Sequence, residues 1–72
     1  MLIKIRLARW VKAHRTERKL SQAELAKMAG IQRETIVQIE GGKSNPRLST
    51  IEVIAYSLNV DISQLFYNHL TE

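Results

Sequence analysis

The chain of 72 residues has no cysteine, one proline, three glycines and only four aromatic residues. Without cysteine it can form neither a disulfide nor a thiolate metal site. Its longest apolar runs are far shorter than the ~18 residues of a transmembrane helix, and its basic start lacks the apolar core of a signal peptide. These absences predict one cytoplasmic domain over residues 1–72 with no membrane partner.

The signatures of an enzyme are missing as well. The two histidines, His14 and His69, are far apart and lack ligand companions, so we expect no zinc site. The segment Gly41–Ser44 lacks the first glycine and the preceding strand of a phosphate-binding loop, and nothing positions a nucleophile. We therefore expect no enzymatic activity, no metal or other cofactor, and no small-molecule ligand.

Positive charge is concentrated at the start of the chain and absent from its end. Residues 1–19 hold seven Lys/Arg and one Glu, residues 20–47 hold four Lys/Arg and three Glu, and residues 48–72 hold three acids and no Lys or Arg. The segments therefore carry +6, +1 and −3, within a total of +4. Such a basic front fits a protein that presents one side to phosphates, although a solvated surface with a modest positive excess has the same composition.

Residues 21–40, SQAELAKMAGIQRETIVQIE, have the pattern of two short helices joined by a tight turn. Residues 29–31 form the bend, where Gly30 takes the positive φ that ends a helix at little cost. The residues expected between the two helices are small or apolar: Leu25, Ala26, Ile31, Ile36 and Ile39. The pattern predicts a helix-turn-helix unit, and the alternative is an ordinary pair of amphipathic helices in a small bundle.

Helix boundaries follow from capping boxes, in which a Ser, Thr or Asp precedes a Glu or Gln by three residues. Strong boxes pair Ser21 with Glu24 and Ser49 with Glu52, and a weaker one pairs Asp61 with Gln64. Gln32 is a poor N-cap, so the start of the third helix is less sharply defined. We expect helices over about residues 8–19, 21–30, 32–40, 49–58 and from 61 onward, with a loop over 43–48.

Residues 3–7 alternate strictly between apolar and basic side chains, the pattern of a half-buried strand. We favour a short N-terminal β-strand that pairs with the C-terminal segment or with a second subunit. The alternative is an N-terminal extension of the first helix.

The chain resembles the Cro/repressor-type (Xre-like) helix-turn-helix proteins of phages and bacteria over about residues 9–67. The residues that carry the resemblance are Leu20-Ser21-Gln22, Ile39-Glu40-Gly41-Gly42-Lys43, Asn45-Pro46, Leu48-Ser49-Thr50-Ile51 and Leu58–Phe66. The resemblance implies an all-α, five-helix lambda-repressor-like DNA-binding domain, with or without the N-terminal strand. It also implies a transcription regulator, such as a phage-type repressor, a restriction–modification controller or an antitoxin-like autoregulator.

At 100° per residue, the third helix separates a core side from an outer side. Thr35, Ile36 and Ile39 fall toward the core, and the outer side carries Arg33, Glu34, Val37 and Gln38. If the docking resembles that of the family, these four side chains read bases in the major groove. Arg33 would bond guanine, Glu34 would accept from cytosine or orient Arg33, and Gln38 would pair with adenine. Val37 would contact a thymine methyl group or be partly covered by a loop.

A second set of residues is expected along the DNA backbone, where free N–H groups of a helix N-terminus also favour an anion. These residues are Gln22, Gln32, Thr35, Lys43, Asn45 and Arg47. The resemblance further implies a structural salt bridge between Arg15 and Glu40, because an acid at a helix C-terminus opposes the helix dipole.

The C-terminal segment is rich in apolar residues for a chain end. Part of this segment must cover the core of its own subunit, and we expect Ile62, Leu65, Phe66 and Tyr67 to contribute to a homodimer interface over about residues 61–70, to which residues 2–7 could add. The alternative is a monomer whose tail only closes its own core. The predicted function is thus sequence-specific binding of double-stranded DNA by a homodimer on an inverted-repeat operator. The alternative is a protein-interaction or antitoxin-like module on the same fold, whose main partner is another protein.

Overall fold

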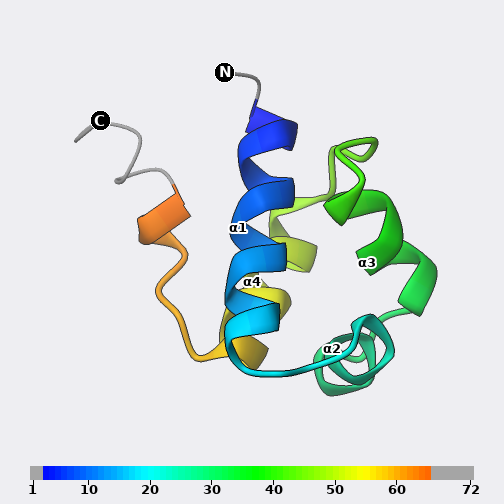
Figure 1. Ribbon diagram of the computed structural model, residues 1–72. Helices are drawn as coiled ribbons and strands as arrows, with labels where there is room; N and C mark the ends of the chain where they lie inside the picture. Colours follow the sequence, from blue (N-terminus) through cyan, green and yellow to red (C-terminus); the bar gives the residue numbers. More distant parts are fainter. Residues whose placement is uncertain (1–2, 66–72) are drawn as a thin grey trace.

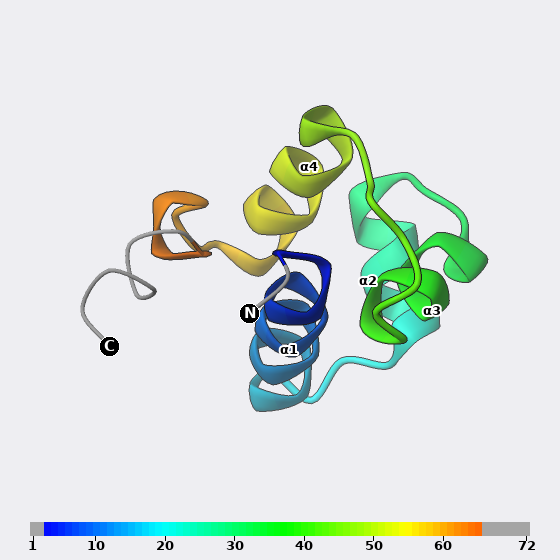
Figure 2. The ribbon, with the colours of Figure 1, turned by 90° about the horizontal axis from the view of Figure 1, so that it is seen from above.

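The computed structural model describes residues 3–65, and within this part the regular secondary structure is all α-helical, with no strand. Its helices are α1 (Ile3–Glu17), α2 (Gln22–Ala29), α3 (Arg33–Glu40) and α4 (Leu48–Leu58), and a short helical turn covers residues 63–65. In both views α2 and α3 lie on one side of α1, and the turn at 63–65 lies on the other (Figures 1 and 2). Within this range no helix is both long and apolar enough to cross a membrane.

The N-terminal strand is wrong, because residues 3–7 form the first turns of α1. Leu7 also fits a helical spacing, because it lies on one buried stripe of α1 together with Trp10 and Val11. The Arg6 guanidinium donates from Nε to the carbonyl of Leu65 at 2.7 Å, which ties the start of α1 to the end of the described chain. An alternation over only five residues is too short to distinguish the two-residue period of a strand from the 3.6-residue period of a helix.

The start of α2 confirms its capping box. The Ser21 hydroxyl accepts from the Glu24 backbone N–H at 3.0 Å, and the Ser21 backbone N–H donates to Glu24 Oε1 at 2.7 Å. These bonds lower the pKa of the Glu24 carboxyl below its ordinary value, the backbone N–H of Ser21 being the larger cause. At the other end Gly30 has a φ of 71°, the left-handed conformation that the sequence predicted.

The capping box predicted for α4 is wrong. The helix begins at Leu48 after an extended Arg47, which makes no side-chain cap, so Ser49 lies inside the first turn. The Thr50 and Ile51 backbone N–H groups donate to the Arg47 carbonyl at 3.0 and 3.2 Å. The helical hydrogen bonds therefore start at Arg47, two residues before the position that the box predicted. At residue 61 the expected cap forms in part, because Asp61 Oδ1 accepts from the Ser63 backbone N–H at 2.9 Å.

All four helices and the last turn contribute to one hydrophobic core. Its fully buried large side chains are Val11, Leu25, Ile36, Ile39, Ile54, Leu58 and Leu65. Leu25, Ile36 and Ile39 thereby confirm the inward positions predicted for the helix-turn-helix unit. The core holds α3 by its inner face and leaves the opposite face of that helix in solvent.

Candidate nucleic-acid interface

The joint between α2 and α3 has the predicted form. Ala26 is buried at the crossing, and Gly30 turns the chain with its N–H donating to the Lys27 carbonyl at 3.2 Å. Ile31 packs partly buried against the core, and its N–H donates to the Ala26 carbonyl at 3.0 Å. Both hydrogen bonds return to carbonyls in the last turn of α2, so they fix the conformation of the turn that leads into α3.

The outer face of α3 separates from the core face as the helical spacing predicts. Arg33, Glu34 and Gln38 are exposed, Val37 is half-buried, and Ile36 and Ile39 are buried beneath them. Three long polar side chains therefore stand on a helix that is held rigidly from behind. A convex helix face of this kind has the width and the donors and acceptors that fit a major groove.

The residues expected along a DNA backbone surround this face on two sides. Gln32, Lys43, Asn45 and Arg47 are exposed in the segments before and after α3. Gln22 and Thr35 are half-buried, so only part of each side chain is available to a ligand. The loop after α3 stays close to the helix, because the Lys43 N–H donates to the Gln38 carbonyl at 3.1 Å.

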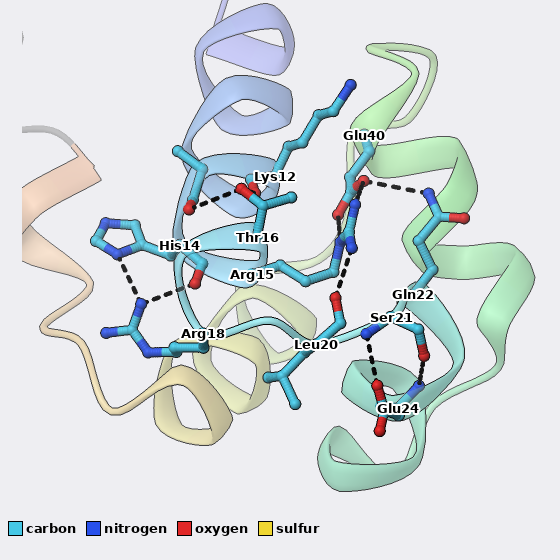
Figure 3. Close-up of polar contacts among 11 residues, drawn as sticks. Lys12, His14, Arg15, Thr16, Arg18, Leu20, Ser21, Gln22, Glu24 and Glu40 are labelled. Atoms are coloured by element: carbon cyan, nitrogen blue, oxygen red, sulfur yellow. Dashed lines mark hydrogen bonds and ion pairs between the residues drawn. The ribbon is translucent and has the colours of Figure 1, made fainter.

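The ion pair expected between Arg15 and Glu40 is present, and it joins α1 to the end of α3 (Figure 3). Arg15 donates from Nε to Glu40 Oε2 at 2.6 Å and from Nη2 to Oε1 at 3.0 Å, and its Nη1 donates to the Leu20 carbonyl at 2.6 Å. The two side chains are only 12% and 5% exposed. The hydrogen bond to Glu40 raises the pKa of Arg15 above its ordinary value, with burial opposing the shift.

Sequence reasoning missed that Gln22 belongs to the same network. Its Nε2 donates to Glu40 Oε1 at 3.1 Å, so the Glu40 carboxylate holds a residue of α2 as well as one of α1 (Figure 3). Nothing in the spacing of residues 22 and 40 signals this contact. The N-terminus of α2 is thereby fixed relative to α3, and one N–H of the Gln22 amide remains for a further acceptor.

A second missed contact lies on the outer face of α3. Gln38 Nε2 donates to Glu34 Oε1 at 2.9 Å. Here a signal was available, because side chains four residues apart on a helix are neighbours. Within residues 3–65 no hydrogen bond or ion pair joins Glu34 to Arg33, the partner that the sequence had suggested.

The residues expected at a dimer interface fall into three groups. Leu65 is 1% exposed in the core of its own chain, so assigning it to an interface was wrong. Its side chain fills the space that Trp10, Val11 and neighbouring core residues leave on that side of α1. Ile62 is half-buried, and Phe66 and Tyr67 lie outside the described residues. The contribution of residues 2–7 as a strand is lost with the strand itself.

An open apolar groove lies beside Ile62 and was not expected from the sequence. Its volume is about 500 Å³, and it runs between the outer side of α4 and the segment that follows; it is lined by Glu52, Val53, Ala55, Tyr56, Val60, Asp61 and Ile62. Tyr56 is 88% exposed there. The only signal in the sequence was an aromatic residue, Tyr56, that shares a face of α4 with the polar Glu52 four residues earlier. Elsewhere among the described residues, no group of three or more His, Cys, Asp or Glu could hold a metal ion.

Comparisons with known proteins agree with this geometry. A family model described as helix-turn-helix, HTH_3, matches residues 11–65. The chain is 42% identical over 55 residues to the immunity repressor protein of Bacillus phage phi105, a match that covers 76% of this chain and 38% of that repressor. It is 37% identical over 65 residues to the control protein C.SmaI of Serratia marcescens, covering 90% of this chain and 77% of that protein.

Among solved structures, the restriction-modification controller protein C.AhdI of Aeromonas hydrophila is similar to this chain at a TM-score of 0.82 and 27% identity. The match covers 86% of this chain and 94% of that one. The chain therefore spans less than half the length of the phage repressor but nearly the whole of the controller.

Proposed function

The chain belongs to the helix-turn-helix family HTH_3, a family of DNA-binding transcription regulators and not of enzymes, and we propose that it binds an inverted-repeat operator as a homodimer. The observation that supports this proposal most directly is the outer face of α3. There Arg33, Glu34 and Gln38 are exposed over a helix whose inner side is buried. We further propose that it acts in the cytoplasm.

Base reading is assigned to Arg33, Glu34, Val37 and Gln38. Arg33 is exposed in the first turn of α3, and its guanidinium suits the O6 and N7 acceptors of guanine. Gln38 lies more than one turn further on and suits adenine, and the half-buried Val37 suits a thymine methyl group. Glu34 is either a direct acceptor for a cytosine amino group or a partner of Gln38.

Backbone contacts are assigned to Gln22, Gln32, Thr35, Lys43, Asn45 and Arg47. Gln22 is the first residue of α2, where free backbone N–H groups favour a phosphate, and Glu40 holds its amide in place. Lys43 and Arg47 supply positive charge in the loop after α3. These two cations give four contacts in a dimer, so the logarithm of affinity is expected to fall with the logarithm of salt concentration with a slope of roughly −4.

The homodimer is assigned to the side of the molecule opposite α2 and α3. The groove beside Tyr56 and Ile62 exposes apolar surface that a second copy would cover. The lining of the groove includes Glu52 and Asp61 but no Lys or Arg, so the groove is unsuited to phosphates. Two-fold symmetry would then place the two α3 helices about 34 Å apart, one turn of DNA.

The test is a selection of bound sequences from random duplex DNA, followed by titration of the best site at two salt concentrations. Recovery of an inverted repeat, with half-sites about one turn apart and a steep salt slope, is the expected result. Enrichment of a single unrepeated half-site would contradict the homodimer alone. No enrichment would contradict the whole proposal.

One observation favours a second candidate, a module whose main partner is another protein. Tyr56 and Val53 expose apolar surface on α4 that no described residue covers. Under this reading the groove binds that partner and the contacts of α3 with DNA are weak. Binding of random and selected duplexes with equal affinity would favour it.

A further inference from the structure

Glu34 and Gln38 form a hydrogen-bonded pair on the proposed base-reading face. Gln38 Nε2 donates to Glu34 Oε1 at 2.9 Å, and both side chains are exposed on the outer side of α3. Since Arg33 is not bonded to Glu34, the carboxylate is directed along the helix toward Gln38.

The pair determines which end of the Gln38 amide faces Glu34. An ionised carboxylate can only accept hydrogen bonds, so it attracts the amide NH₂ group and repels the amide oxygen. Without such a neighbour, the terminal torsion of a glutamine is broad, and the oxygen and nitrogen exchange places at little cost. Glu34 therefore selects one of two orientations that an isolated Gln38 would populate.

The two orientations of a glutamine amide suit different purines. The amide oxygen together with the N–H cis to it matches the N6 amino group and the N7 acceptor of adenine. The trans N–H takes no part in that pairing and is free for Glu34. A flipped amide instead presents its NH₂ donors to the base, which suits the O6 and N7 acceptors of guanine.

We propose that Glu34 is a positioning residue that makes Gln38 select adenine over guanine. This inference rests on the proposed function, because it requires that α3 reads bases. In the free protein the pair is in water, where such helix contacts contribute little. Docking against DNA removes that water, and a hydrogen bond is stronger in the drier surroundings. The negative charge of Glu34 lowers affinity for every sequence, so its value lies in discrimination.

The experiment is the same duplex selection applied to the wild type and to the variants Gln38→Ala, Glu34→Ala and Glu34→Gln. Gln38→Ala first identifies the base pair that Gln38 reads, where the wild type prefers adenine over guanine by about tenfold or more. Glu34→Ala is expected to bring the two purines near equality at that same base pair. Glu34→Gln is expected to weaken the preference, because its amide can donate to Gln38 as well as accept from it and so no longer selects one orientation.

Three results would overturn the inference while leaving the proposed function intact. The first is an unchanged adenine preference in Glu34→Ala. The second is a change at a base pair other than the one altered by Gln38→Ala, which would show that Glu34 reads its own base. The third is an adenine preference in Glu34→Gln equal to that of the wild type, which would show that an acceptor-only neighbour is not needed. No enriched sequence with the wild type would instead overturn the proposed function and the inference with it.

Discussion

At the scale of single residues, the placement of α2 relative to α3 on the proposed DNA-binding side depends on Glu40. This carboxylate lies at the C-terminus of α3, where the helix dipole disfavours an anion, and it is almost entirely buried. It is stabilised by donors from two other helices, Arg15 of α1 and Gln22 of α2. Glu40 therefore holds together the two elements that would meet the same stretch of DNA.

Removing the Glu40 carboxylate is expected to lower the free energy of unfolding by more than removing an exposed carboxylate does. Glu40→Ala leaves the Arg15 guanidinium buried and unpaired, so we expect a loss of about 2 kcal/mol or more in the free energy of unfolding. The double variant Arg15→Met with Glu40→Leu is expected to recover much of that loss. Glu17→Ala, which removes an exposed carboxylate of α1, is the control and is expected to change stability by less than about 0.5 kcal/mol. Urea denaturation measures all three, and equal losses for Glu40→Ala and Glu17→Ala would contradict the buried network.

Substitutions of Arg33 and Lys43 are expected to affect DNA binding in different ways. Arg33→Ala removes a proposed base contact, so it is expected to cost about 1–3 kcal/mol on the operator and to relax the preference at one base pair. Lys43→Ala removes a proposed phosphate contact, so it is expected to weaken operator and random DNA alike and to reduce the salt slope by about one. Titration of both duplexes at two salt concentrations distinguishes them, and the same pattern in both variants would refute the assignment.

At the scale of elements, the sequence predicted what depends on neighbours in the chain. The capping box of α2, the left-handed Gly30 and the buried stripe of α3 are all local patterns, and the structure confirms them. The helical start of α1 over residues 3–7 is held by a hydrogen bond from Arg6 to the distant Leu65 carbonyl, which no local pattern contains. The hydrogen bond between Gln22 and Glu40 was missed for the same reason.

The cap of α2 gives a prediction for acidic pH. The pKa of the Glu24 carboxyl is lowered in the folded protein, so its bonds with Ser21 stabilise the fold above the ordinary glutamate pKa of about 4.5 and are lost as pH falls through the lower, folded value. Ser21→Ala is expected to cost about 1 kcal/mol at neutral pH. Glu24→Gln removes the titrating carboxyl, so its melting temperature is expected to fall less steeply with pH below about 4.5 than that of the wild type, whereas Ser21→Ala keeps the backbone N–H that is the larger cause of the shift. Parallel pH profiles of melting temperature would contradict this.

Two glycines with the same backbone conformation are expected to respond differently to alanine. Gly30 and Gly42 have φ values of 71° and 70°, so both substitutions carry about 1 kcal/mol of backbone strain. A Cβ at Gly30 meets nothing within 4 Å, whereas one at Gly42 lies 3.0 Å from Ile5 Cδ1. Gly42→Ala is therefore expected to be the more destabilising, unless Ile5 moves.

Ile5→Val removes that Cδ1 atom and provides the control. In this background the difference between Gly42→Ala and Gly30→Ala is expected to disappear, because only the backbone strain remains. Thermal denaturation of the single and double variants measures it. An unchanged difference would show that the contact between α1 and the loop after α3 does not cause it.

At the scale of the whole molecule, two functions are assigned to opposite sides. The α2–α3 pair lies on one side of α1, and the turn at 63–65 lies on the other (Figure 2). The side with α2 and α3 is proposed to meet DNA, and the groove beside Tyr56 is proposed to meet a second copy. With this separation a dimer could form without covering α3.

The groove predicts the effect of a charge at its rim. Tyr56 is almost fully exposed, so Tyr56→Glu is expected to leave folding intact while it places a charge, next to Glu52 and Asp61, in an apolar interface. Sedimentation equilibrium is expected to show a shift from dimer to monomer. Met28→Glu introduces the same charge at an exposed apolar position of α2 and is expected to leave self-association unchanged. A dimer that survives Tyr56→Glu would place the interface elsewhere.

The central claim is that the outer face of α3 reads a DNA sequence. Its most direct test is the ratio of affinities for the selected operator and for a scrambled duplex of equal length, measured at physiological salt with the wild type and with Arg33→Ala. We expect the wild type to prefer the operator by about 10³-fold or more, and Arg33→Ala to lower that ratio with little effect on the scrambled duplex. A wild-type ratio near one, or a ratio that Arg33→Ala leaves unchanged, would contradict the claim.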